Sequence, residues 1–263
     1  MFDNITIFST PKHFKDEIGV IQYNAIKSWT LLNPKPEILL FGYENGISDI
    51  SKELGLRHIT NVERNMLGTP LIQSIFHNAN QFATNNILVY INSDIILLND
   101  FVQTVIKIHN SLSKYIIIGQ RWDVNIKSFI DFNDCFWEEK LKRFSLLTGK
   151  LHEPTGIDYF VFNKKIDLWL SFPHYAVGRI LWDNMSIYYA LQKKIPVIDA
   201  TNSIFAIHQN HGYNHLKDLN DIDRKGFESD ISIKLSGGFN NAKTIVDSTH
   251  RFINNSIIHL GHR

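Results

Sequence analysis

The stretch ILVYINSDIILLND at residues 87–100 decides the fold of this 263-residue chain. The segment NILVYI at residues 86–91 consists almost entirely of large apolar residues, which predicts a strand buried on both faces. Asn99 and Asp100 can cap a following helix whose apolar face begins at Phe101. A buried strand followed directly by a helix is typical of parallel sheets that helices cover on both faces.

The alternation of strand and helix extends along the chain. The patterns predict further strands at residues 4–9, 37–42, 115–120, 158–163 and 195–199, and helices at residues 18–29, 71–82 and 182–192. We therefore expect a single-domain α/β fold, with an open, twisted, mainly parallel sheet flanked by helices. We expect residues 1–218 to form this domain. Residues 219–263 are polar and contain Gly, and we expect a C-terminal extension there, a candidate lid or acceptor-side segment.

Composition excludes several classes of function. The formal net charge is +1 and no run of five like charges occurs, so the chain lacks the basic surface of a nucleic-acid-binding protein. Cys135 is the only cysteine, which excludes a cysteine-based zinc site. No stretch approaches the roughly 18 to 20 apolar residues of a membrane span, and residues 1–15 lack the pattern of a signal peptide. We expect a cytoplasmic protein, whose oligomeric state the sequence does not indicate.

Polar side chains follow the strand at residues 86–91 where it ends. Asn92 and Asp94 are separated by one residue, so in an extended chain both point to the same side. Because open α/β folds bind ligands at the carboxyl edge of the sheet, both side chains can enter one crevice there. Carboxylate oxygens suit Mg²⁺ or Mn²⁺, so Asp94 is a candidate metal ligand. The alternative is that these residues are only a polar turn that ends a core strand.

A histidine cluster is the second candidate site. The segment AIHQNHGYNH contains His208, His211 and His215 within eight residues. Imidazoles so close together can bind a metal ion or a phosphate. A surface cluster without function is the competing interpretation, and no HExxH helix supports a purely histidine-based zinc site.

Carboxylates also occur at the start of two later elements. Asp183 lies at the start of the expected helix at residues 182–192, where it is either an ordinary first-turn residue or a general base. Asp158 leads the expected strand at residues 158–163, either as a turn residue or as a group that binds a hydroxyl-rich substrate. Arg121 and Asp123 follow the strand at residues 115–120, and Arg121 could pair with a phosphate through two hydrogen bonds.

Several segments together resemble bacterial-type glycosyltransferases of the GT-A class. In chain order they are NMLGTPLI, YINSDIILL, GQRWDV, GIDYFVF, GRILWDN and HQNHGYNH, from about residue 65 to residue 215. In that class an N-terminal α/β half binds the nucleotide of the sugar donor, and one strand ends in an Asp-x-Asp motif. Here the motif is Asn92-Ser93-Asp94, in which Asn replaces the first carboxylate.

The resemblance implies a metal-dependent enzyme that moves a sugar from a nucleoside diphosphate sugar to a hydroxyl of a glycan or glycoconjugate, as in polysaccharide biosynthesis. It implies that Asp94 binds Mn²⁺ or Mg²⁺ and that His208 or His211 completes the metal site. It also implies that Asn92, at the motif position that commonly faces the ribose, hydrogen-bonds that sugar. Such an enzyme would associate with a membrane only peripherally, through its acceptor.

The resemblance also implies roles at other positions. Asp183 matches the base of inverting members, and Asp158 or Asp123 would be the next choices. A retaining mechanism stays open. Ser9, Thr10 and Thr69 would line the nucleotide site, and Arg121 would lie at the same edge of the sheet.

Three other functions remain open at this point. A sugar nucleotidyltransferase would have a basic, Gly-rich loop after the first strand, and STPKHFKD does not match it. A metal-dependent phosphohydrolase would need more carboxylates or histidines at strand ends in the first half. A non-catalytic carbohydrate-binding module would leave the candidate oxygen ligand Asp94 unexplained. Three common motifs are absent from the sequence. They are GxGxxG, the dinucleotide-binding fingerprint; GxxxxGK[ST], the P-loop; and GxSxG, the nucleophile elbow of α/β-hydrolases.

Overall fold

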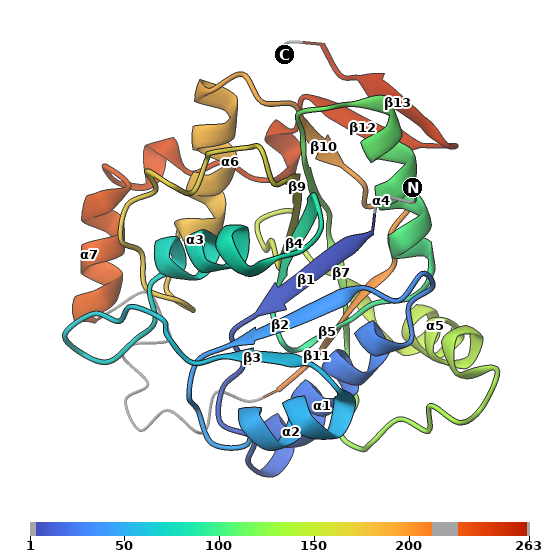
Figure 1. Ribbon diagram of the computed structural model, residues 1–263. Helices are drawn as coiled ribbons and strands as arrows, with labels where there is room; N and C mark the ends of the chain where they lie inside the picture. The colour runs from blue at the N-terminus through green and yellow to red at the C-terminus, as the bar shows by residue number, and fades with distance from the viewer. Residues whose placement is uncertain (1–3, 212–225, 262–263) are drawn as a thin grey trace.

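The computed structural model describes residues 4–211 and 226–261, which form an α/β fold around a nine-stranded sheet (Figure 1). The strand order within these residues is β13-β12-β10-β6-β9-β4-β1-β2-β3. Five of the eight neighbouring pairs are parallel and three are antiparallel. The expected α/β class with a mainly parallel sheet is therefore confirmed.

The first half of the chain builds one side of the sheet by repeated strand–helix units. Its parallel strands are β1 (Ile5–Ser9), β2 (Glu37–Phe41), β3 (Arg57–Ile59) and β4 (Ile87–Ile91). The helices between them are α1 (Asp16–Thr30), α2 (Ile47–Leu54) and α3 (Ile72–Phe82). All strands and helices expected from the sequence in this half are present, with small shifts at their ends.

An antiparallel strand at the centre of the sheet brings two polar segments together. β9 (Tyr159–Asn163) lies between β4 and β6 (Ile116–Ile118) and runs opposite to both. The start of β9, which Asp158 precedes, therefore lies beside the end of β4, which Asn92 follows. The backbone N–H of Asn92 donates to the carbonyl of Asp158 at 2.9 Å. The remaining parts of this region are α4 (Asp100–Ser111), α6 (Trp182–Gln192) and β10 (Val197–Asp199), which is parallel to β6.

A second, four-stranded sheet carries much of the candidate site. Its order is β5 (Ile95–Ile96), β11 (Ala206–Gln209), β7 (Arg121–Val124) and β8 (Lys150–Leu151), and α5 (Trp137–Thr148) connects β7 with β8. The register places His208 directly opposite Asp123 on β7 and Ile95 on β5. This small sheet was not expected, because strands of two to four residues show no readable periodicity.

The C-terminal segment contributes to the main sheet. It contains α7 (Phe227–Leu235), the 3-10 turns η2 (Phe239–Asn241) and η3 (Ile245–Asp247), and the hairpin β12 (His250–Ile253) and β13 (Ser256–His259). β12 pairs in parallel with β10, and β13 pairs antiparallel with β12. The lid role of residues 219–263 stays a prediction, and residues 219–225 lie outside the described part of the chain.

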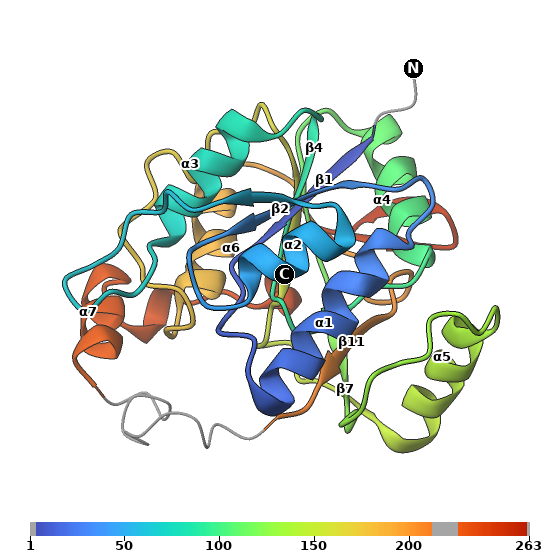
Figure 2. The ribbon, with the colours of Figure 1, turned by 60° about the horizontal axis from the view of Figure 1, so that its bottom comes forward.

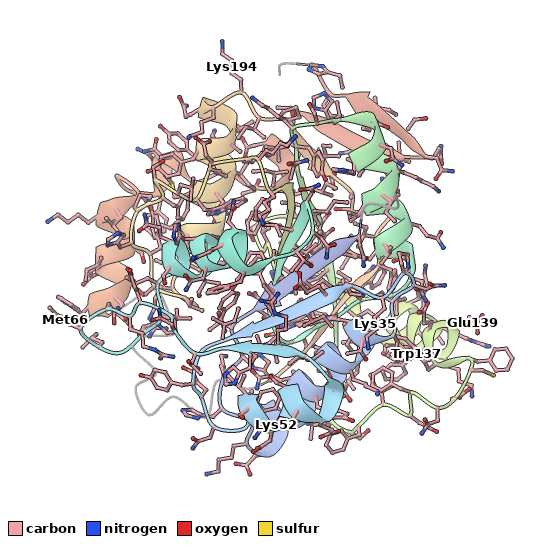
Figure 3. All side chains as sticks on the ribbon, viewed as in Figure 1. Lys35, Lys52, Met66, Trp137, Glu139 and Lys194 are labelled. Atoms are coloured by element: carbon pink, nitrogen blue, oxygen red, sulfur yellow. The ribbon has the colours of Figure 1, made fainter. Side chains whose placement is uncertain are left out.

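The core lies on both faces of the main sheet, as the apolar run of β4 predicts. Val89 packs into one apolar cluster and its neighbour Tyr90 into the other. Helices α1, α2, α4 and α5 contribute to the first cluster, and α3 and α6 to the second, so helices cover both faces (Figure 2). The side chains of Lys52 and Lys194 are exposed and project outward (Figure 3). No helix in the described ranges has both the length and the apolar character needed to cross a membrane.

Candidate active site

The turn between β4 and β5 positions the Asn-Ser-Asp motif. Asn92 donates from Nδ2 to Asp158 Oδ1 at 2.8 Å, and its own Oδ1 accepts from the Tyr90 hydroxyl at 3.1 Å. Ser93 donates to Gln22 Oε1 at 3.0 Å, and the same oxygen accepts the backbone N–H of Lys12 at 2.6 Å. The turn is therefore tied to the loop after β1 through a buried glutamine that sequence reasoning missed.

Asp94, His208 and His211 come together across this turn and form a cluster that fits a metal ion. The Nε2 atoms of His211 and His208 lie 3.3 and 3.8 Å from Asp94 Oδ2. One ligand atom of each residue, an imidazole nitrogen or a carboxylate oxygen, lies within 4.8 Å of the ligand atoms of the other two. Asp94 Oδ1 is buried, and no described group hydrogen-bonds to it. A carboxylate and two imidazoles are ligands that proteins offer to divalent metals, so this donor set fits such an ion.

The charges around Asp94 keep its carboxylate ionised. Burial acts to raise the pKa of Asp94, but the hydrogen bond from His211 and the positive charge of His208 outweigh burial and lower that pKa well below its usual value. Burial acts to lower the pKa of His208, and contact with Asp123 and Asp94 raises it above its usual value. An ionised carboxylate is the form that binds a cation.

Arg121 and Asp123 form an ionic network behind the cluster. Arg121 pairs through one guanidinium nitrogen with Asp158 and through Nε with Asp123 Oδ1 at 2.9 Å. His208 Nδ1 lies 3.1 Å from the same Asp123 oxygen. Burial opposes the charge of Arg121, but Asp158 and Asp123 raise the pKa of its guanidinium. Two carboxylates engage Arg121 through Nε and Nη1, and its predicted contact with a phosphate stays a prediction.

His152 joins the same network and was not singled out from the sequence. It follows β8, and its Nδ1 lies 2.6 Å from Asp123 Oδ2. The sequence carries no signal for this contact, because it depends on the pairing of β7 with β8.

A large cleft opens beside these residues. Its volume is about 2020 Å³, and residues from the β1–α1 loop, the loop before α3 and the start of α6 line it. Among the residues expected from the sequence, it is lined by Thr10, Thr69, Asp183 and His211. Ser9 does not line the cleft: it is buried, and its hydroxyl donates to the carbonyl of Ile91 at 2.6 Å. His215 lies outside the described residues.

Asp183 has the environment of a carboxyl group that can exchange a proton near neutral pH. It lies in the first turn of α6, and its Oδ1 accepts the backbone N–H of Asn184 at 2.9 Å. Burial raises the pKa of Asp183 to about 7, because the helix hydrogen bond offsets burial only in part and the negative charge of Asp158 adds to it. Asp183 is therefore both a helix-start residue and a candidate base.

Comparison with known proteins places the fold but assigns no family. No protein-family model matches the chain, and no curated protein matches it. A crystal structure of GalNAc-T7 with UDP, GalNAc and Mn²⁺ is similar over 89% of this chain, with a TM-score of 0.57 and 11% identity. This chain covers 48% of the GalNAc-T7 chain, about half of its length.

A crystal structure of M. tuberculosis glucosyl-3-phosphoglycerate synthase is similar over 91% of this chain and 80% of that one, with a TM-score of 0.50 and 12% identity. The chain has the GT-A fold. At identities this low the likeness concerns the fold alone, and activity has to be argued from the site.

Proposed function

We propose that the protein is a metal-dependent glycosyltransferase that moves a sugar from a nucleoside diphosphate sugar to a hydroxyl acceptor. One observation carries the proposal: Asp94, His208 and His211 meet beside a cleft that also contains Asp183. The GT-A fold supports it. Of the two similar structures, one contains UDP, GalNAc and Mn²⁺, and the other is a synthase whose name refers to a glucosyl compound. The Mn²⁺ and UDP of the GalNAc-T7 structure make these two ligands the first to test.

The cluster accounts for binding of the donor diphosphate. Asp94, His208 and His211 would hold Mn²⁺ or Mg²⁺, whose charge would offset that of the departing nucleotide. Thr10 and Thr69 line the cleft and would contact the nucleotide, and Thr10 Oγ1 is a buried atom to which no described group hydrogen-bonds. Asn92 is held by Asp158 and Tyr90 at the end of β4 and would contact the sugar.

Asp183 is the proposed base of an inverting transfer. Its carboxylate would accept the proton of the acceptor hydroxyl as that oxygen bonds to the anomeric carbon and the bond from this carbon to the diphosphate breaks. Asp158 is the second choice. Both of its oxygens are already engaged, one by Asn92 and one by Arg121, which leaves Asp183 better placed to receive a proton. The proposed acceptor is a glycan or glycoconjugate, as in polysaccharide biosynthesis.

Ligand-dependent thermal unfolding tests the proposal. The wild type would be heated with UDP, GDP, CDP or dTDP, each with Mn²⁺ or with EDTA, and compared with Asp94→Ala. Asp49→Ala is the matched control, because Asp49 is exposed on α2. We expect one nucleotide to raise the melting temperature of the wild type and the control only with Mn²⁺, and to have no effect on Asp94→Ala.

A second measurement links binding to the reaction. The nucleotide that stabilises the protein identifies the donor series, and release of that nucleotide from its sugar conjugates then reports turnover. If none of the four nucleotides raises the melting temperature in Mn²⁺, nucleotide-sugar transfer is refuted. A shift that persists in EDTA or in Asp94→Ala would refute the metal site at Asp94.

A further inference from the structure

The imidazole of His152 is held at one nitrogen and presented to the cleft. The ring hydrogen-bonds through Nδ1 to Asp123 Oδ2 at 2.6 Å, while Arg121 Nη2, which can only donate, lies 3.5 Å from the same nitrogen and does not hydrogen-bond to it when Nδ1 carries the proton. The side chain is 30% exposed and lines the cleft that also contains Asp183. A carboxylate that holds Nδ1 keeps the proton there in the neutral ring, which leaves Nε2 as a hydrogen-bond acceptor.

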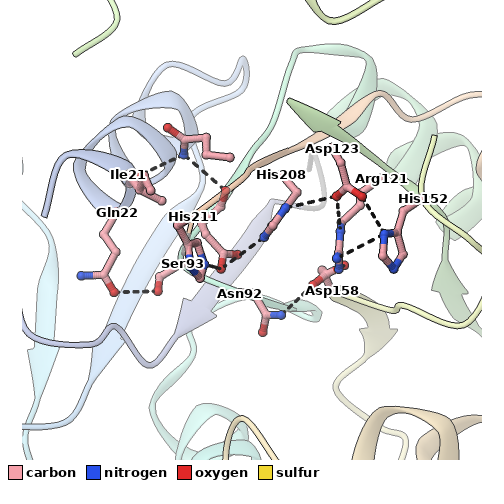
Figure 4. Close-up of polar contacts among 12 residues, drawn as sticks. Ile21, Gln22, Asn92, Ser93, Arg121, Asp123, His152, Asp158, His208 and His211 are labelled. Carbon is pink, nitrogen blue, oxygen red and sulfur yellow. Dashed lines mark hydrogen bonds and ion pairs between the residues drawn. The ribbon is translucent and has the colours of Figure 1, made fainter. Parts of the chain in front are cut away.

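Asp123 hydrogen-bonds His152 and also lies within ion-pair distance of His208. Its Oδ1 lies 3.1 Å from His208 Nδ1, and its Oδ2 lies 2.6 Å from His152 Nδ1 (Figure 4). The Nε2 atom of His208 is thereby directed to Asp94, 3.8 Å away. The Nε2 atom of His152 has no such partner among the described residues, and it is this nitrogen that remains for a ligand.

Gly156 leaves the space that the His152 ring occupies. A Cβ atom built on Gly156 would lie 2.7 Å from His152 Nε2 and 2.6 Å from its Cδ2, too close for either pair of atoms. The φ angle of Gly156 is not in the left-handed region, so its backbone does not demand glycine. An alanine at this position would therefore displace the imidazole.

We propose that His152 is a sugar-binding residue, whose Nε2 accepts a hydrogen bond from a carbohydrate hydroxyl, and that Asp123 is its positioning residue. This inference rests on the proposed glycosyltransferase function. The hydroxyl belongs either to the transferred sugar or to the acceptor glycan. Asp123 then positions His208 in the metal cluster and His152 at the sugar. One carboxylate thereby fixes the position of the metal site relative to the sugar.

The test compares four variants with the wild type. His152→Ala removes the acceptor atom, His152→Gln retains an oxygen that can accept from a hydroxyl, and Gly156→Ala displaces the ring. His77→Ala is the control, because His77 is exposed on α3 and does not line the cleft. The KM values for donor and acceptor, kcat, and the Mn²⁺ affinity by electron paramagnetic resonance are measured for each.

We expect His152→Ala and Gly156→Ala to raise one KM roughly tenfold, the size of one lost hydrogen bond. His152→Gln should recover part of that loss, and Mn²⁺ affinity should be unchanged in all three. A raised donor KM assigns the hydroxyl to the transferred sugar, and a raised acceptor KM assigns it to the acceptor. Nitrogen chemical shifts of the wild-type imidazole should place the proton on Nδ1.

Several results would overturn the inference. It fails if both KM values of His152→Ala stay within twofold of the wild type, if Mn²⁺ affinity falls in that variant, or if the proton is found on Nε2. A wild type that transfers sugar while His152→Ala is unaffected refutes the inference alone. A wild type that binds no nucleotide sugar refutes the proposed function, and the inference falls with it.

Discussion

Asp183 combines a position in the cleft with a pKa raised to about 7, chiefly by burial and in part by the charge of Asp158. If Asp183 is the base, kcat/KM should rise with pH until about 7, because only the ionised carboxylate accepts a proton. Asp183→Asn should lower kcat by about 10²- to 10⁴-fold. Steady-state rates between pH 5 and 9, in roughly unit steps, measure both effects. A pH profile of the wild type that is flat through 7 would contradict this role.

The same residue makes a prediction for stability. Because the folded-state pKa of Asp183 is raised, its contribution to stability is fully present below the unfolded pKa of 3.8 and is lost as pH rises through about 7. Asp183→Asn should remove this part of the pH dependence, so urea unfolding of the variant should vary less between pH 4 and 8. Equal pH dependence in both proteins would show that the carboxyl group titrates normally.

Individual site residues differed in how far the sequence could predict them. Asp94 and His211 were predicted because each lies in a short polar segment next to an apolar strand, and the structure brings them together. Ser9 belongs to a similar pattern, yet its hydroxyl is used inside the core by the Ile91 carbonyl. His152 was missed because its partner Asp123 lies 29 residues away, and only strand pairing brings them together.

At the scale of elements, α7 is fixed to the wall of the cleft by one buried carboxylate. Glu228, 4% exposed, accepts from Arg179 Nε at 2.8 Å and also from Asn65. Burial opposes its charge, but the hydrogen bonds from Asn65, Thr69 and Arg179 lower its pKa. The C-terminal segment therefore holds two loops that line the cleft, those of Thr69 and Arg179.

Replacement of Glu228 should destabilise the folded protein. Glu228→Ala leaves Arg179 without its counter-charge, and we expect the free energy of unfolding to fall by about 3 kcal/mol. Glu139→Ala, at an exposed position on α5, should change it by less than about 0.5 kcal/mol. In a double-mutant cycle, Arg179→Ala should cost less in the Glu228→Ala background than in the wild type. Additive losses would mean that the two side chains do not stabilise α7 as a pair.

For the whole molecule, the long apolar strands predicted the class of fold, while the edges of the structure could not be predicted. β4 is buried along its whole length, which requires other elements to cover both faces of the sheet, and the helical patterns on either side of β4 in the sequence identify them as helices. The β12–β13 hairpin, by contrast, is exposed along most of β13, so His259 and its neighbours show no apolar alternation. The two-residue strand β5 is defined by its pairing with the longer β11, a contact that its own sequence does not indicate.

The charge of the whole site predicts that metal and nucleotide bind cooperatively. Three carboxylates, those of Asp94, Asp123 and Asp158, lie at or behind the metal cluster, and Arg121 is already paired with two of them. Five described lysines and arginines line the cleft and attract a diphosphate, while a cation at Asp94 would offset the repulsion from these carboxylates. We expect Mn²⁺ to tighten UDP binding by about 5- to 150-fold, and UDP to tighten Mn²⁺ binding by the same factor, because coupling between two ligands is reciprocal. Calorimetric titrations of each ligand with and without the other measure both factors. In Asp94→Ala the factor should fall to about one, and equal UDP affinity of the wild type with and without Mn²⁺ would contradict the coupling.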